Sequence, residues 1–182
     1  MPKPALILVD IQNDYFEGGR WPVHAMAKAG DNAARLLAAA RTAGDTVIHI
    51  RHEIPSDDAP FFRPGSDGAQ IHASVAPQGD EPVLLKHRPN SFVGTDLLDR
   101  LKAADTKEVT ICGAMSQMCI DATARAAADH GFKVTVVEDA CGPKETAFDG
   151  VTVPAPLVHA TIMGALDGTY ATVMTTEAYL KG

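Results

Sequence analysis

The chain has 182 residues, of which 46% are hydrophobic and 21% are charged, and its formal net charge at pH 7 is -7. A chain of this length suits one domain, covering residues 1–182, with a sheet covered by helices. The negative charge argues against nucleic acid or an anionic membrane as a main partner. No apolar run approaches the ~20 residues that cross a bilayer, and we expect no signal peptide. Three cysteines without CxxC or zinc-type spacing favour free thiols and a cytoplasmic location.

Short β-rich runs alternate with helical patterns along the chain. The predicted strands are residues 5–10, 45–51, 82–86, 108–114, 133–139 and 170–175. The predicted helices are 31–44, which opens on an Asp or Asn cap and ends at Gly44, 94–105 with Thr95 as N-cap, 119–130, and 154–168. This alternation predicts an α/β fold, a three-layer α/β/α arrangement around a mostly parallel, doubly wound, six-stranded sheet.

The segment from about residue 53 to residue 81 breaks the alternation. It contains four prolines and few periodic apolar residues, so we expect a long irregular excursion between two strands. Loops of that length in compact domains are usually functional or disordered. The chain has no GxGxxG, P-loop, HExxH or GxSxG pattern, which removes the usual markers of nucleotide-phosphate sites and of those hydrolase classes.

Three predicted strands end in, or run toward, a chemically reactive side chain. The first ends at Asp10, the third ends at Lys86, and the fourth leads into the turn that carries Cys119. Ligands of open α/β sheets bind beyond the carboxyl ends of the strands. If the strands are parallel, a carboxylate, an ammonium and a thiol therefore meet at one edge of the sheet.

These three groups together suit nucleophilic catalysis. A helix N-terminus and a nearby cation, here Lys86, favour the thiolate form of Cys119. Asp10 can take the thiol proton and later give it to a leaving amine, and the amides of the turn can bind an oxyanion. Each residue alone has a plainer interpretation, since a strand-end Asp is often a cap, a strand-end Lys a solvated charge, and a buried Cys inert.

The segments LILVDIQNDYFEGG, VLLKHRPNSFVGTDL and ICGAMSQMCIDATARAAADHGF together resemble the isochorismatase-like cysteine hydrolases, in order and spacing, over essentially the whole chain. That family includes nicotinamidases, N-carbamoylsarcosine and ureidoacrylate amidohydrolases and streptothricin hydrolases. The resemblance implies that Cys119 is the nucleophile, Asp10 the base and Lys86 the third catalytic residue. It further implies a cis peptide between Ala114 and Met115 and an oxyanion hole made by the amides of Met115 and Cys119.

The chain departs from parts of the family. Isochorismatases proper lack the nucleophilic cysteine, so Cys119 favours hydrolysis of an amide or a related C–N bond. Nicotinamidases bind a metal through an Asp-x-His and a further His, whereas this chain has IRHEIP at the matching strand end. A metal set of His52, Glu53 and His72 stays open as an alternative, but we expect neither a metal nor a cofactor. Ser116 stands where relatives often have Thr, and we interpret its hydroxyl as stabilising the turn.

Loops beside these residues supply candidates for the substrate pocket, and each has an equally plain role in packing or in bonding the backbone. The candidates are Gln12, Phe16, Trp21, Phe61, Phe92 and Met115. Of the two remaining thiols, Cys112 is expected to be buried filler and Cys141 is expected to lie in a loop.

The sequence therefore predicts a hydrolase that cleaves a C–N bond of a small amide, ureide or lactam through a thioester on Cys119. Two alternatives stay open: a thiol-based redox or peroxide-responsive protein, and a catalytically silent binding module on the same fold. The resemblance also implies a homodimer or homotetramer, in which a neighbouring subunit closes the pocket at the excursion 53–81.

Overall fold

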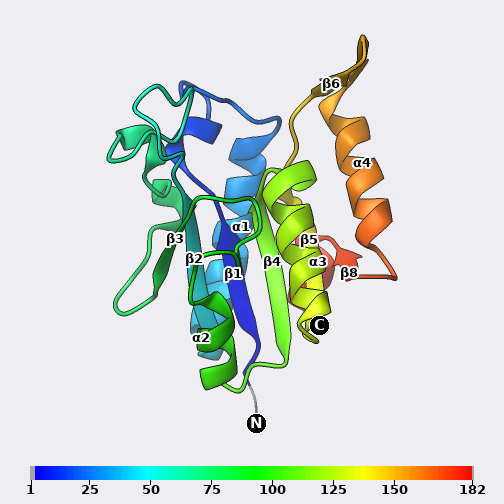
Figure 1. Cartoon of the computed structure of the whole chain (residues 1–182). Helices are drawn as coiled ribbons and strands as arrows, with labels where there is room; N and C mark the ends of the chain where they lie inside the picture. The colour runs from blue at the N-terminus through cyan, green and yellow to red at the C-terminus, as the bar shows by residue number, and fades with distance from the viewer. Residues whose placement is uncertain (1–2, 182) are drawn as a thin grey trace.

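A six-stranded parallel sheet forms the centre of the computed structural model, which describes residues 3–181 (Figure 1). The strand order is β3-β2-β1-β4-β5-β8. The strands are β1 (Ala5–Val9), β2 (Thr46–His52), β3 (Val83–Lys86), β4 (Glu108–Ala114), β5 (Lys133–Gly142) and β8 (Thr172–Met174). The chain reverses its direction of travel across the sheet between β1 and β4, so their carboxyl ends mark the switch point at which such sheets bind ligands.

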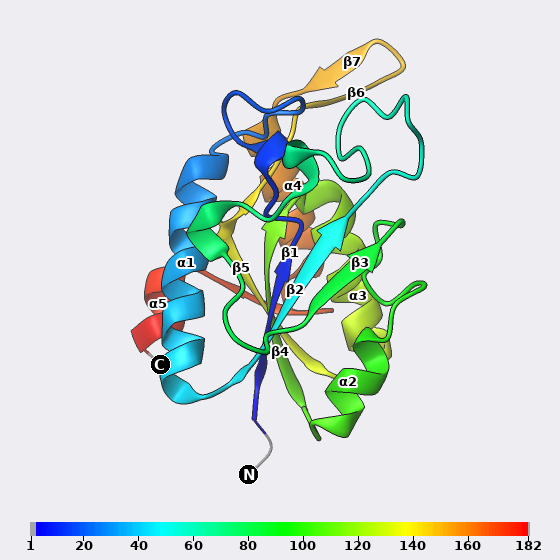
Figure 2. The same ribbon diagram turned by 90° about the vertical axis from the view of Figure 1, so that its left-hand side faces the viewer.

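Helices cover both faces of this sheet (Figure 2). One face carries α1 (Met26–Ala43) and α5 (Thr176–Lys181), and the other carries α2 (Leu97–Ala103), α3 (Asp121–Asp129) and α4 (Ala155–Leu166). The predicted three-layer α/β/α fold is confirmed. Every residue of β1 is buried, as expected for a strand between two layers of helices. Within residues 3–181 no helix combines the length and the apolar character needed to cross a bilayer.

Helix boundaries differ from the prediction at the N-terminal ends. The first helix begins at Met26, five residues before the predicted start, because Ala25 adopts a left-handed conformation (φ 54°) that turns the chain directly into the helix. Its end at Gly44 (φ 68°) is as predicted. Helix α2 begins at Leu97, although the hydroxyl of Thr95 does accept the Leu97 N–H at 3.3 Å.

Several local features were not predicted, among them helix α5 (Thr176–Lys181). Between β4 and α3, residues Ser116–Ile120 form one π-helical turn. Strand β5 continues to Gly142, so Cys141 lies in the sheet and not in a loop. A β-hairpin of β6 (Thr146–Phe148) and β7 (Val151–Val153) then projects beyond the carboxyl edge of the sheet.

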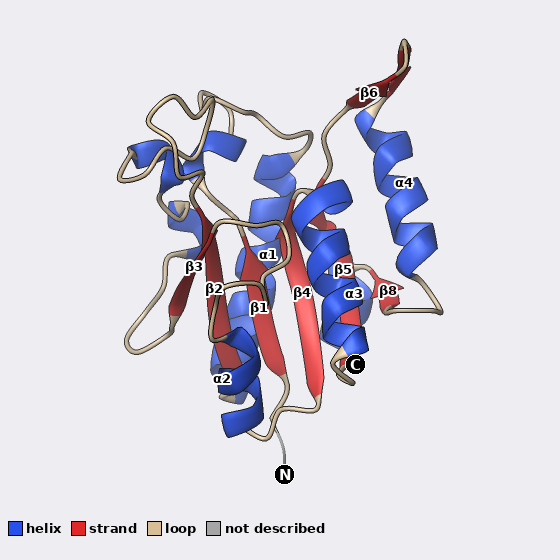
Figure 3. Cartoon of the chain, in the orientation of Figure 1, coloured by secondary structure: helices blue, strands red, loops and turns tan. Residues whose placement is uncertain are grey.

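The excursion 53–81, mostly irregular chain, begins over the carboxyl edge of the sheet and then returns past α1 to the start of β3 (Figure 3). Two buried side chains of the segment after β1 hold it there. The Gln12 amide donates to the carbonyls of His52 and Ala69, both at 2.8 Å, and accepts the His52 N–H at 2.8 Å. The Asp14 carboxylate accepts the Phe62 N–H at 2.7 Å. Backbone groups that lack strand partners are thereby satisfied by side chains, which fixes an irregular segment in place.

The far end of the excursion is fixed by Glu81. Its carboxylate accepts two hydrogen bonds from Arg41 of α1, both at 2.7 Å, and lies 3.0 Å from His49 Nε2 of β2. The Arg41 guanidinium holds the pKa of Glu81 down from 4.5 to about 2. Such a bidentate guanidinium–carboxylate pair is among the stronger ionic contacts in proteins.

Gly113 brings the strand before the catalytic turn close to β1. It has a φ of 128°, and a Cβ at this position would stand 1.9 Å from the Val9 carbonyl oxygen. The register of β4 against β5 also shifts between Ile111 and Gly113. A residue with a side chain would therefore push apart the two strands whose ends carry Asp10 and Cys119.

We expect Glu81→Gln to lower the free energy of unfolding by about 1–2 kcal/mol at pH 7, because it removes the charge from a partly exposed pair. The folded-state pKa of Glu81 is lowered, so this stability is complete above pH 4.5 and is lost as the pH falls toward 2. Urea unfolding of both proteins at pH 7 and near pH 3 measures this. Glu145→Gln is the matched control, because Glu145 is exposed. An equal loss at both pH values would contradict a charge-based role.

We expect Gly113→Ala to lower the free energy of unfolding by at least about 2 kcal/mol, because the added methyl group meets the Val9 carbonyl. Gly164→Ala in α4 is the control. A Cβ there has no heavy atom within 4 Å, so we expect no loss and a gain of up to about 1 kcal/mol. Urea unfolding of the two variants decides the matter, and equal stabilities would contradict the steric argument.

Candidate active site

The ammonium of Lys86 joins the side chains of Asp10 and Cys119 at the carboxyl edge of the sheet. Lys86 is the last residue of β3, Asp10 follows β1, and Cys119 lies in the π-helical turn after β4. The distance from Lys86 Nζ is 2.7 Å to Asp10 Oδ2 and 3.2 Å to Cys119 Sγ. The structure therefore brings together the three residues singled out from the sequence.

Asp10 reaches this position through an unusual backbone conformation. Its φ of 52° is in the left-handed region, which Asp and Asn adopt more readily than most residues. The Asp10 N–H still donates to the Ile50 carbonyl at 3.0 Å, so the residue stays tied to β2 as the chain leaves the sheet. The turn directs the carboxylate toward Lys86 instead of toward solvent.

His52 is a fourth member of this cluster, and sequence reasoning assigned it only to a possible metal set. Its Nδ1 lies 3.0 Å from Lys86 Nζ, 3.8 Å from Asp10 Oδ2 and 4.0 Å from Cys119 Sγ. A signal was available: His52 ends β2, and in the parallel register it stands directly beside Lys86 of β3. A strand-end histidine next to a predicted catalytic lysine belongs to the same edge of the sheet.

The alternative metal set of His52, Glu53 and His72 is not assembled. Glu53 accepts the Gly65 N–H and pairs with Arg51, while His72 caps a short 3-10 helix and stacks on Phe16. Within residues 3–181, one group could converge on an ion, namely Asp10, His52 and Cys119. The Lys86 ammonium lies within 3.2 Å of a ligand atom of each, so it fills the position that a metal ion would take. This donor set therefore does not fit a metal while Lys86 is in place.

The carboxylate and the ammonium stabilise each other's charge in a buried setting. Asp10 is 0% exposed and Lys86 is 1% exposed. Burial is the largest influence on Asp10 and raises its pKa, but the Lys86 charge together with the contacts to His52 and Cys119 outweighs it, so the net pKa is lowered. Burial is also the largest influence on Lys86 and lowers its pKa, but the contacts with Asp10 and Cys119 together outweigh it, so the net pKa is raised. The ion pair is the ground state of the site.

The surroundings of the Cys119 thiol raise its pKa, whereas the sequence predicted surroundings that favour the thiolate. Burial and then the Asp10 carboxylate raise the pKa of Cys119, and Lys86 offsets only part of that rise. Lys86 does favour the thiolate, as expected from the sequence, but burial and Asp10 outweigh it and the net pKa is raised. Burial dominates because Cys119 is only 3% exposed. Cys119 carries its proton until a base removes it.

A buried oxygen of Asp10 is positioned to be that base. Lys86 holds Oδ2, whereas Oδ1 is buried and has no hydrogen-bond partner within residues 3–181. A carboxylate oxygen of Asp10 and the Cys119 sulfur lie within 4.8 Å of each other. An unpaired buried carboxylate oxygen is costly unless it has a task, and accepting the thiol proton is such a task.

The turn before Cys119 carries backbone groups that suit an oxyanion. The Ala114–Met115 peptide bond is cis. The Met115 carbonyl accepts the N–H groups of both Met118 and Ile120, and no acceptor within residues 3–181 pairs with the Met115 N–H. A free amide on the turn that bears the thiol is the kind of donor an oxyanion hole requires.

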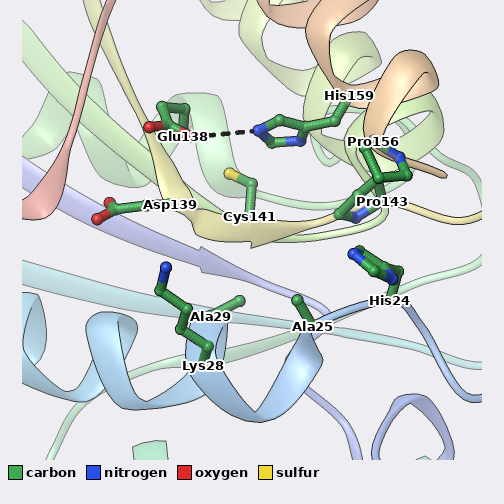
Figure 4. Close-up of a pocket in the computed structure, with 10 residues that line it drawn as sticks. All are labelled: His24, Ala25, Lys28, Ala29, Glu138, Asp139, Cys141, Pro143, Pro156 and His159. Carbon is green, nitrogen blue, oxygen red and sulfur yellow. Dashed lines mark hydrogen bonds and ion pairs between the residues drawn. The ribbon is translucent and has the colours of Figure 1, made fainter.

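Ser116 anchors the same turn to α4. Its hydroxyl lies 2.9 Å from His159 Nδ1, and His159 Nε2 lies 3.3 Å from Glu138 of β5. Figure 4 shows His159 and Glu138 on the wall of a cavity of about 210 Å³ that Cys141 also lines. None of the four clustered side chains lines this cavity, so it lies beside the catalytic turn and does not contain the thiol.

Aromatic rings pack in a row that leads to His52. Trp21 stacks on Phe61 with ring centroids 4.8 Å apart, Phe61 meets Phe62 at 5.0 Å, and Phe62 lies 6.0 Å from His52. Tyr15 packs on Phe62 at 4.5 Å and was not predicted. Burial, with the nearby Cys119 and Asp10, raises the pKa of Tyr15 well above its ordinary value. This row forms an apolar wall near the reactive cluster.

Other predicted pocket residues have different surroundings. Gln12 is fully buried, and its amide is engaged with backbone groups of the excursion. Phe16 stacks on His72 with centroids 3.6 Å apart. Phe92 packs against His130 and Phe132, at the end of α3 that lies away from Cys119. Sequence proximity to a reactive residue placed these side chains in the pocket, but the loops turn them elsewhere.

Comparison with known proteins gives a consistent assignment. Residues 4–178 match the model of the Isochorismatase domain. The uncharacterized isochorismatase family protein YddQ of Bacillus subtilis is 48% identical over 177 residues, 97% of this chain and 98% of that protein. Maleamate amidohydrolase of Pseudomonas putida is 33% identical over 159 residues, which cover 79% of this chain and 74% of that enzyme.

The crystal structure of an isochorismatase hydrolase from Oleispira antarctica superposes on this chain with a TM-score of 0.96 and 48% sequence identity. The match covers 100% of this chain and 97% of that one. The range matched by the family model includes Asp10, Lys86 and Cys119, and YddQ and this crystal structure match nearly the whole chain. The chain is therefore a hydrolase of the isochorismatase family.

Proposed function

We propose that this protein is a cysteine-dependent amidohydrolase that cleaves a C–N bond of a small amide, ureide or lactam through a thioester on Cys119. One observation carries the proposal: Lys86 binds both Asp10 Oδ2 and Cys119 Sγ, while Asp10 Oδ1 is left without a partner within residues 3–181 and an oxygen of this carboxylate lies within 4.8 Å of the sulfur. A nucleophile, a base and a group that orients both are thus within reach of one another.

In the first half of the reaction, Cys119 Sγ attacks the substrate carbonyl carbon as its proton passes to Asp10. The negative charge that develops on the carbonyl oxygen is met by the N–H groups of Met115 and Cys119. Collapse of this intermediate breaks the C–N bond, and the proton on Asp10 moves to the departing nitrogen. The products at this stage are a free amine or ammonia and a thioester on Cys119.

In the second half, water attacks the thioester carbonyl and gives a proton to Asp10. Collapse then breaks the C–S bond, the proton returns to sulfur, and the carboxylic acid leaves. Lys86 stays charged throughout, because its bond to Asp10 Oδ2 keeps the carboxyl group oriented while Oδ1 gains and loses the proton. No other acid or base is needed for proton balance.

A small substrate fits the surroundings. The sulfur lies in a site that is almost fully buried, and the Trp21–Phe61–Phe62 row provides an apolar boundary. The relative named maleamate amidohydrolase supports a short acyl amide as a first substrate to test. The two alternatives, a thiol redox protein and a silent binding module, are separated by the experiment below.

We expect Cys119→Ala to abolish turnover and Asp10→Asn to lower kcat by about a hundredfold or more, because the first removes the nucleophile and the second the base. Release of ammonia or amine from maleamate, ureides and lactams measures this. Cys141→Ala is the control with unchanged turnover, since Cys141 lies in the separate cavity. Full activity of Cys119→Ala contradicts the proposal, and a peroxide-induced internal disulfide without turnover favours the redox alternative.

We also expect Cys119 to remain a thiol at neutral pH, because burial and Asp10 raise its pKa above its ordinary value. Because the pKa is raised above its ordinary value, the thiol keeps its proton at pH 7. The difference in ultraviolet thiolate absorbance between wild type and Cys119→Ala measures this directly. A thiolate band already complete at pH 7 would contradict it, and would indicate the anionic nucleophile expected from the sequence.

A further inference from the structure

The hydrogen bonds of Lys86 fix the protonation of His52. An ammonium has three N–H donors and no acceptor, and the three partners of Lys86 Nζ are Asp10 Oδ2, His52 Nδ1 and Cys119 Sγ. Each partner must therefore offer a lone pair. Since Nδ1 of a neutral imidazole can accept only when the proton is on the other nitrogen, His52 is the Nε2–H tautomer.

The Nε2–H group of His52 is an available donor. Within residues 3–181 it has no hydrogen-bond partner, and it is not sealed from solvent, in contrast to the buried unpaired Asp10 Oδ1 and Trp21 Nε1. The His52 side chain is 14% exposed, so the ring has one edge on the buried cluster and another on accessible space. The nearby His49 differs, because its Nε2 is engaged by Glu81.

This donor belongs to a ring that lies close to the Cys119 sulfur. Nδ1 of the same ring is 4.0 Å from the Cys119 sulfur, so a molecule whose carbonyl carbon contacts the sulfur has its neighbouring atoms beside His52. Phe62 packs near the ring, with centroids 6.0 Å apart, which makes the surroundings apolar. A lone donor in such surroundings rejects ligands that leave it unpaired.

We propose that His52 is a specificity-determining residue whose Nε2–H donates a hydrogen bond to an oxygen acceptor of the substrate while Lys86 holds the opposite ring nitrogen. The inference rests on the amidohydrolase function proposed above and narrows its substrates. Favoured substrates carry an oxygen acceptor within reach of His52, and analogues with an apolar group at that place react poorly.

Two substitutions of His52 test the contact of Nδ1 with Lys86 and the Nε2–H donor separately. In His52→Asn the side-chain amide reaches the position of Nδ1, so its oxygen can accept from Lys86 but the Nε2 donor is lost. In His52→Gln the longer side chain carries an N–H donor to the position of Nε2, but the acceptor for Lys86 is lost. A role limited to supporting Lys86 and a role in contacting the substrate therefore predict opposite orders of the two variants.

The readout is the rate of Cys119 alkylation, which requires no known substrate. Iodoacetamide carries an amide oxygen acceptor and methyl iodide carries none, so the ratio of the two rates reports the contact with the acceptor. We expect His52→Asn to lower this ratio about tenfold, as for the loss of one hydrogen bond, and His52→Gln to keep most of it. A ratio unchanged in His52→Asn, or lowered equally in both variants, overturns the proposal.

A second measurement is made on the wild-type protein, and the variant His52→Gln serves only to assign the signal. The proton–nitrogen spectrum of the wild-type histidine rings must contain, at pH 7, an Nε2–H tautomer that disappears in His52→Gln. A His52 ring protonated on Nδ1 overturns the proposal. Failure of the amidohydrolase function is a separate result, because it appears as absent turnover in a protein whose alkylation ratio still depends on His52.

Discussion

The site depends on one buried ammonium. Lys86 Nζ contacts Asp10, His52 and Cys119. These residues lie at or just beyond the carboxyl ends of β1, β2 and β4. An unpaired charge at this depth would be costly, so the ion pair with Asp10 is needed to keep Lys86 protonated. Once formed, it holds the ammonium within 3.2 Å of Cys119 Sγ and 3.0 Å of His52 Nδ1, in the position that a metal ion would take.

The rest of the fold makes that meeting possible. Parallel strands put their carboxyl ends on one edge, and the absence of a side chain at Gly113 lets the strand before the catalytic turn approach β1 closely. Gln12 and Asp14 leave the same segment as Asp10 but bond backbone groups of the excursion 53–81. In this short segment, Asp10 therefore contacts Lys86 in the candidate active site, whereas Gln12 and Asp14 hold the excursion 53–81 in place.

Burial decides how the chemistry can run. Exclusion of water keeps Cys119 protonated, in spite of an ammonium 3.2 Å away, because the Asp10 carboxylate and the apolar surroundings outweigh that cation. In the mechanism proposed above, the nucleophile forms only when the proton moves to Asp10. A resting thiol is also less exposed to oxidation than a resting thiolate, which suits a hydrolase better than a redox protein.

Local patterning predicted the α/β class, the six strands of the central sheet, helices α1 to α4, and the strand ends that carry Asp10, Lys86 and the Cys119 turn. These follow from local hydrophobic patterning and from the rule that parallel strands share one ligand-binding edge. Four features could be seen only in the folded chain: the contacts of His52, the surroundings of Phe16 and Phe92, the start of α1 at Met26 and the raised pKa of Cys119. Each of these depends on which groups lie close together in the folded chain and on how much water they exclude. Local sequence patterns predict neither of these.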